Sequence, residues 1–438
     1  MDNVLDPVDQ AMFEFGRATG VDVLIQCAWV YDRAINNDGV RRFHDQLQRG
    51  RLSRRIERSP LPFGRHRWVS PSNSNGLEIV KAPRPREDFD SWLNEQANTT
   101  ALDPEHGPQW HLAVLPFTEG GAGVSLLVPH CVADGIGVAE AVADAALGRD
   151  DPVSWPAAAS RRRWRAVRED ARQSMRDIRP MGRAIAAVAR SARQSGADAA
   201  SGSATSLPPF AGSDKPIAVP IATMLIDADE WEARAHSLGG TSNSLLVGLT
   251  ARLAEHRGRV TADGSVNLRI PRNERTDGDT RGNAVSPVDT VVDPAPAASD
   301  LSGIRSAIKQ ALIRHRQLPD YDRALMSLVP LVPKRLLKKI AGNGTGVVST
   351  HLGAVNPAAT RPDGTDADQF AMKMHYAGVT DEIMHRFGGL QIVASGSANG
   401  QVFLMVHAYQ PGRPNSNDDL RHDLSRVLKE FSLTGTHL

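Results

Sequence analysis

Two apolar runs that are joined by a glycine-rich turn, and followed at once by a helical pattern, constrain this chain more than any other feature. Residues 110–117 (WHLAVLPF) and 124–130 (VSLLVPH) read as strands, and the TEGGAG between them has the length and glycines of a β-hairpin connection. DGIGVAEAVADAALG at 134–148 then places small apolar residues at helical spacing and ends on Gly148. The pattern predicts a core hairpin that leads directly into a helix.

The turn between this hairpin and its helix holds two conspicuous residues. His130 ends the second strand, and Asp134 stands where a helix cap is expected. One interpretation is a half-buried histidine beside a capping aspartate. The other is an imidazole at the mouth of a core strand, held by a sharp turn so that it acts as a general base.

Composition narrows the class of protein. A net charge of +1 does not indicate a protein that binds nucleic acid. The two cysteines, Cys27 and Cys131, match neither the spacing of a metal site nor a disulfide framework. No run approaches the ~18–20 apolar residues of a membrane span, and the first residues lack a secretory signal. We therefore expect a cytoplasmic protein without a bound metal.

The chain of 438 residues is longer than one core usually holds, so two subdomains are expected. A flexible stretch rich in Gly, Ser, Ala and Pro predicts an N-terminal subdomain over 1–175, a crossover linker over 176–212 and a C-terminal subdomain over 213–438. In the second half, the patterns predict strands over 215–226 and 346–355, helices over 241–258 and 332–342, and a hairpin over 389–409 turning at Asn399-Gly400.

Other candidate motifs stand in the wrong context. GNGTG at 342–346 follows a predicted helix and precedes a strand, whereas a phosphate-binding loop follows a strand and opens a helix. SGSANG at 395–400 lacks the G-x-S-x-G spacing of a nucleophile elbow. Cys131 neighbours His130 along a strand, so their side chains point to opposite faces. His130 remains the main candidate.

Segments along nearly the whole chain resemble one superfamily. HCVADG at 130–135 is similar to the H-x-x-x-D-G signature of the coenzyme A-dependent acyltransferases, which include chloramphenicol acetyltransferase, plant-type acyltransferases, peptide-synthetase condensation domains and bacterial wax ester synthase/diacylglycerol acyltransferases. Further segments resemble the last group in the same order: LDPVDQAMF (5–13), LDPEHGPQWHLAVLP (102–116), TSNSLLVGLTARLAEH (241–256), VNLRIP…RGNAVSP (266–287) and VVSTHLGAV (347–355).

The resemblance implies an α/β fold of two chloramphenicol-acetyltransferase-like subdomains, with mixed sheets and a tunnel between them. It implies transfer of an acyl group from acyl-CoA, a co-substrate rather than a bound cofactor, to an alcohol, giving a wax ester or triacylglycerol-type product. His130 would take the acceptor's proton, without an acyl-enzyme. Two alternatives stay open: a tailoring or condensation-like enzyme of secondary metabolism with a carrier-bound donor or polar acceptor, and a non-catalytic binding member.

The resemblance also assigns supporting residues. Asp134 and Gly135 would hold the loop, with Arg269 as the partner of Asp134, although an ordinary surface role for Arg269 fits equally. Residues implied at the substrate or tunnel are Asn243, Asn283, Ser349, Thr350 and His351.

Three positions depart from the family pattern, the last two of which bear on the acceptor pocket or the acyl carrier. Pro129 replaces the first of two adjacent histidines that many wax ester synthases carry. Ser244 replaces the aspartate of an Asn-Asp pair, and Thr350-His351 replaces the asparagine of the S-N-x-G strand.

Residues 161–193 carry 11 arginines against three acids, with an apolar stripe at helical spacing that includes Trp164 and Met175. Three interpretations fit this segment. It is a solvated helix that covers the crossover, a helix on a membrane surface, or a docking site for an acidic acyl-carrier protein or the phosphates of coenzyme A.

Overall fold

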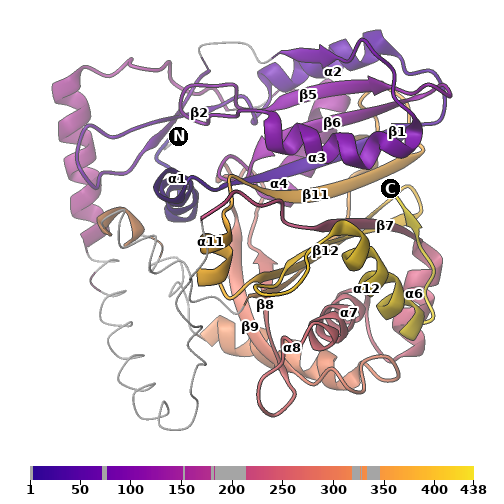
Figure 1. Cartoon of the computed structure of the whole chain (residues 1–438). Coiled ribbons are helices and arrows are strands. Elements are labelled where there is room, and N and C mark those ends of the chain that lie inside the picture. Colours follow the sequence, from indigo (N-terminus) through magenta and orange to yellow (C-terminus); the bar gives the residue numbers. More distant parts are fainter. Residues whose placement is uncertain are drawn as a thin grey trace.

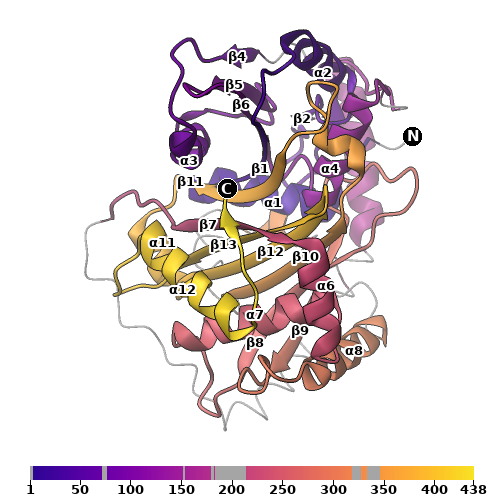
Figure 2. The same ribbon diagram turned by 90° about the vertical axis from the view of Figure 1, so that its right-hand side faces the viewer.

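Two sheets, one above the other, organise the molecule (Figures 1 and 2). The structure is a computed structural model that describes residues 3–71, 76–150, 153–178, 214–317, 328–332 and 346–438, together with Met326 and Gly182. The predicted helix over 332–342, the GNGTG segment and most of the predicted linker over 176–212 lie outside the described residues.

The first sheet carries the hairpin that the sequence predicts. Its five strands have the order β11-β1-β6-β5-β4, antiparallel except for β4 and β5. The strands are β1 (Asp22–Tyr31), β4 (Leu77–Ile79), β5 (His111–Pro116), β6 (Ala122–Pro129) and β11 (Gln369–Ala377). Every residue of β6 is buried, because β1 and β5 flank it and helices cover it. A separate two-stranded sheet pairs β2 (Arg55–Glu57) with β3 (Arg67–Val69).

The second sheet has seven strands in the order β14-β7-β13-β12-β10-β8-β9. The strands are β7 (Ile221–Asp227), β8 (Val266–Asn273), β9 (Val285–Val292), β10 (Val347–Ala354), β12 (Leu390–Ala398), β13 (Gln401–Tyr409) and β14 (Thr436–His437). Strand β10 pairs in parallel with both β12 and β8, so this sheet is mixed. The β12–β13 hairpin turns at Asn399-Gly400, both with positive φ, as a type I′ turn requires.

Helices lie over both sheets. They are α1 (Pro7–Thr19), α2 (Asn37–Arg49), α3 (Phe89–Thr99), α4 (Gly135–Ala146), α6 (Ala228–Ser237), α7 (Ser242–His256), α8 (Ser302–Gln317), α11 (Asp381–Arg386) and α12 (Asn417–Glu430), with 3-10 turns η1 (Arg86–Asp88), η2 (Val329–Leu331) and η3 (Pro357–Thr360). Helices α6, α7, α8 and α12 lie against the seven-stranded sheet (Figure 2). None of the helices in the described ranges is long and apolar enough to span a bilayer.

The two sheets do not divide at the linker. Strand β11 comes from the last fifth of the chain, yet it pairs along its length with β1 in the first sheet, as Ala28 opposite Ala371 illustrates. Trp29 of β1 also donates from Nε1 to the carbonyl of Ala359, at 2.8 Å. The two halves of the chain are therefore joined by strand exchange, and the subdomain boundaries stay a prediction.

Candidate functional site

The backbone of His130 is fixed on both sides. Strand β6 ends at Pro129, and the His130 amide donates to the carbonyl of Val23 on β1 at 2.8 Å. Its carbonyl accepts from Nδ2 of Asn283 at 2.9 Å. Because both contacts use main-chain atoms of His130, they set the position from which the imidazole projects.

The imidazole of His130 is partly buried, and only one of its two nitrogens is buried without a partner among the described residues. That nitrogen is Nδ1, so Nε2 is the nitrogen left for a substrate. Burial lowers the pKa of His130 below its usual 6.5, and the charge of Asp134 only partly opposes this. A neutral imidazole near pH 7 can accept a proton.

Asp134 has a structural role that its position in the sequence predicts in part. It caps α4, since its carboxylate accepts from the amide of Gly137 at 2.7 Å. The same carboxylate accepts from the amide of Ala284 at 2.8 Å and from the guanidinium of Arg275 at 2.9 Å. The side chains of Arg275 and Asp134 are only 5% and 4% exposed, so this ion pair lies inside the protein.

The prediction that Arg269 pairs with Asp134 is wrong. Arg269 lies on β8 and binds Asp289 of the neighbouring strand β9 at 2.8 Å, with both side chains largely exposed. Beyond the end of β8, Arg275 stands in a loop that brings it to Asp134. The arginine that binds Asp134 therefore lies in the loop after β8 and not on the strand. The spacing between Arg269 and the Gly-Asn pair did not reveal this.

A second buried carboxylate holds the Gly-Asn segment against the histidine turn. Asp9 of α1 accepts from the amides of Gly282 and Asn283 at 2.8 and 2.7 Å, and from Nδ2 of Asn283 at 3.0 Å. Burial raises the pKa of Asp9 to about 6, against the opposing effects of Arg54 and these donors. Arg54, also buried, donates to the carbonyls of Thr280 and Val132 at 2.6 and 2.7 Å.

The sequence patterns did not predict Asp9, Arg54 or Arg275 as site residues. Asp9 stands inside the LDPVDQAMF segment that carries part of the resemblance, so a signal for it existed. Arg54 has no such signal, because nothing in its surrounding sequence distinguishes it from the many other arginines of the chain.

The other predicted site residues are placed as follows. Gly135 opens α4, where an added Cβ would lie 3.0 Å from the side chain of Leu352 on β10. His351 hydrogen-bonds through Nδ1 to the hydroxyl of Ser395 at 2.9 Å, and Ser349 accepts from Thr250 of α7.

Asn243 lies in the first turn of α7, and Thr350 on β10. Asn283 hydrogen-bonds to His130, whereas no hydrogen bond joins Asn243 or Thr350 to His130 among the described residues. Ser244 forms a capping box with Thr241, so it serves the start of α7.

An apolar cavity of about 330 Å³ lies beside the histidine turn. Pro129 and Cys131, on either side of His130, both contribute to its wall. The remaining wall comes from α1, the start of β1, residues Leu102 and Pro104, and the segment near η2, where Met326 and Val329 lie. A cavity of this size and lining suits an apolar ligand group.

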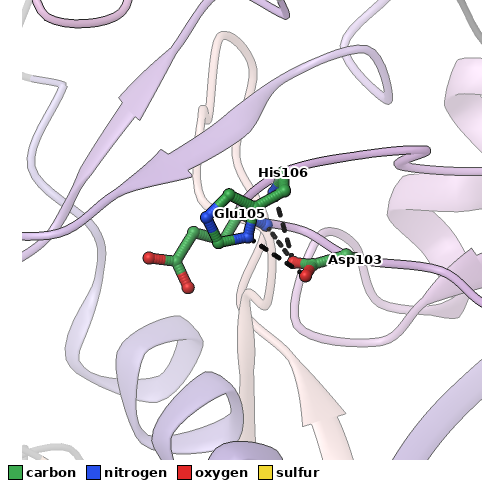
Figure 3. A group of neighbouring side chains, drawn as sticks. All are labelled: Asp103, Glu105 and His106. Carbon is green, nitrogen blue, oxygen red and sulfur yellow. Dashed lines mark hydrogen bonds and ion pairs between the residues drawn. The ribbon is translucent and has the colours of Figure 1, made fainter.

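A partly buried cluster near this cavity consists of two carboxylates, Asp103 and Glu105, and the exposed His106 (Figure 3). Asp103 accepts from the amide of Glu105 at 2.8 Å and contacts Nδ1 of His106 at 3.2 Å. Arg17 of α1 pairs with Asp103, and Arg58 pairs with Glu105 at 2.6 Å. The carboxylates are thus neutralised by arginines, and the cluster fastens the 102–106 loop to α1.

The chain has the fold seen in a condensation domain and in a wax ester synthase, as the motif resemblance predicted. No family model matches the sequence, and no curated protein matches it either.

Solved structures match over the whole chain at low sequence identity. The first condensation domain of the calcium-dependent antibiotic synthetase, in complex with a substrate analogue, has a TM-score of 0.58 at 15% identity, covering 99% of this chain and 96% of that one. Wax ester synthase/diacylglycerol acyltransferase from Marinobacter aquaeolei VT8 has 0.54 at 13%, covering 98% of each chain. Polyketide synthase associated protein 5 from Mycobacterium tuberculosis has 0.53 at 16%, also covering 98% of each.

Proposed function

We propose that this protein is an acyltransferase in which His130 is the general base. The observation that carries the proposal is a neutral, rigidly held histidine whose two neighbours, Pro129 and Cys131, form part of the wall of an apolar cavity. His130 itself does not line the cavity, so in this proposal the apolar acyl chain lies on the Pro129 and Cys131 side of the turn, while the imidazole faces the thioester carbonyl. The favoured donor is an acyl-CoA and the favoured acceptor an alcohol.

In the proposed reaction, Nε2 of His130 takes the proton from the acceptor hydroxyl while its oxygen attacks the thioester carbonyl. The new C–O bond forms, the C–S bond breaks, and the departing thiolate receives the proton from the imidazolium. Asp134 and Arg275 do not touch the reacting atoms in this scheme. They hold the turn that carries His130, together with Asp9 and Asn283.

Free-thiol release measured with a panel of donors and acceptors tests the proposal. Long-chain alcohols, glycerides and polar acceptors are each combined with acyl-CoAs of different length. Acceptor-dependent thiol release with an alcohol supports the proposal. Thiol release only with amines, among the polar acceptors, contradicts an alcohol as the acceptor. The absence of thiol release from every pair contradicts acyl-CoA as the donor.

The similarity to condensation domains favours one second candidate, in which the donor is bound to a carrier protein. The same assay distinguishes it, with acyl groups loaded on a carrier protein in place of CoA. A non-catalytic binding protein would bind acyl thioesters without releasing thiol from either donor.

The pH dependence of turnover should report on His130. Because burial places its pKa below 6.5, the base is neutral above that pH, and kcat/KM should fall only as the pH drops below it. Circular dichroism over the same pH range serves as a control for unfolding. It is needed because burial raises the pKa of Asp9 to about 6, so this carboxylate changes its protonation state in the same pH range. A decline in kcat/KM that begins well above pH 6.5 would contradict His130 as the base.

Filling the cavity should change donor selectivity. Met12 of α1 is half-buried and contributes to the cavity wall, so Met12→Trp would reduce the space beside Cys131. We expect kcat/KM for long-chain acyl donors to fall about tenfold or more relative to an acetyl donor, in line with the usual cost of misfit in apolar pockets. An equal loss for both donors would place the acyl chain elsewhere.

A further inference from the structure

The helix at residues 163–178 is attached to the protein through its polar face. Asp170 on that face is buried and accepts from Arg67 at 3.1 Å, Arg161 at 2.9 Å and the hydroxyl of Ser59 at 2.7 Å. In Figure 1 this magenta helix stands at the left edge, away from the two sheets. Charged contacts therefore orient it, together with the small buried side chain of Ala166.

The apolar stripe of the helix faces solvent. Trp164, Met175 and Ile178 are 85%, 62% and 61% exposed. At 100° per residue, these three positions fall within about 60° of one another, and Asp170 lies roughly 80–140° away around the helix. The stripe predicted from the sequence is therefore real over 163–178, but in this structure it does not cover the protein. The rest of the predicted segment, 179–193, lies outside the described residues apart from Gly182.

A neighbouring loop adds another exposed aromatic residue. Phe63 is 62% exposed and has a φ of 66°, a strained value for a large side chain. It lies between Ser59, which binds Asp170, and Arg65, which lies 3.6 Å from Asp177 of the helix. Phe63, Trp164, Met175 and Ile178 are the four most exposed large hydrophobic residues among those the structure describes.

Exposed arginine side chains lie beside this apolar stripe. The exposed arginines of the segment are Arg162, Arg163, Arg165, Arg168, Arg172 and Arg176. The acids of the helix are occupied, since Glu169 pairs with Arg165 at 2.9 Å and Asp170 and Asp177 face the protein. At 100° per residue, Arg165, Arg168, Arg172 and Arg176 all fall on one side of the stripe, so the exposed face is apolar along one edge and positive along the other.

We propose that the helix at 163–178 and Phe63, together the arginine helix surface, bind the surface of an anionic phospholipid membrane. Trp164 and Ile178 are about 21 Å apart along the helix axis, which suits a helix that lies in the plane of the interface. Apolar side chains enter the acyl boundary, while arginines bind lipid phosphates. An acidic protein partner would match the arginines, but it would not account for three large apolar residues in one line.

Cosedimentation of the full chain with vesicles tests this proposal. We expect binding to vesicles that contain phosphatidylglycerol, and at least about tenfold weaker binding to pure phosphatidylcholine vesicles or at high salt. Trp164→Glu combined with Met175→Glu should reduce binding to the anionic vesicles about tenfold or more, because both apolar contacts are lost.

Val291→Glu is the matched control, since Val291 is an exposed apolar residue on β9 of the seven-stranded sheet, outside the helix at 163–178. It should bind vesicles like the unchanged protein. Equal binding by the double variant would overturn the proposal, as would no binding by the unchanged protein. Binding to an acidic carrier protein through Trp164 and Met175, without vesicle binding, would replace the membrane with that partner. Vesicle binding needs no turnover, so its failure leaves the acyltransferase proposal intact.

Discussion

Replacing His130 with alanine should remove acyl transfer while the protein stays folded. A positioned general base contributes about 10²–10⁴-fold to the rate, so kcat should fall by a factor in that range. The melting temperature should change little. The anchoring hydrogen bonds of residue 130 use its backbone, and its buried Nδ1 has no partner among the described residues that the substitution would leave unpaired.

His111→Ala provides the comparison for that experiment. His111 is also half-buried and lies on the adjacent strand β5, where its Nε2 contacts Glu78 at 2.9 Å. It should retain nearly full turnover. If His130→Ala keeps turnover and fold together, His130 is not the base, and the protein acts through other groups or as a binding protein.

Arg275→Ala should be the most destabilising single substitution at the site. The guanidinium donates to the carboxylate of Asp134 at 2.9 Å and to the carbonyls of Gly282 and Arg281 at 3.0 and 3.1 Å. Its removal leaves a buried carboxylate without its cation, which typically costs about 3–5 kcal/mol. Urea denaturation would measure this loss, and turnover should fall as well because the His130 turn loosens.

Arg269→Ala is the matched control for Arg275→Ala. Arg269 also binds an aspartate, but the Arg269 and Asp289 side chains are 40% and 56% exposed. Exposed pairs of this kind contribute about 0–1 kcal/mol, so the urea midpoint should hardly move. Equal losses from the two arginine variants would show that the buried pair does not hold the site.

Local patterns predicted much of this fold. The hairpin of β5 and β6 and the following helix α4 lie where glycines and apolar spacing place them, and Asp134 caps α4 as its position indicates. The turn at Asn399-Gly400 has the positive φ values that the Asn-Gly pair favours. These features depend on neighbours within a few residues, so the sequence carries them directly.

The supporting contacts of the site depend on distant segments, which sequence patterns do not specify. Asp9 reaches Asn283 across 274 residues, and Arg275 reaches Asp134 across 141. Arg269 and Arg275 both precede the Gly-Asn pair, and only the path of the chain beyond β8 selects one of them. The orientation of the helix at 163–178 depends in the same way on Asp170 and its partners.

The strand exchange at β11 makes the timing of synthesis matter. Strand β1 is made early, but its partner β11 leaves the ribosome about 340 residues later, as the pairing of Ala28 with Ala371 shows. At ~5–20 residues per second, that delay is roughly 20–70 s. During this time the buried, apolar strand β1 has one edge open, and open edges recruit other chains. The first sheet is therefore completed only near the end of translation. We expect the nascent chain to bind chaperones until then.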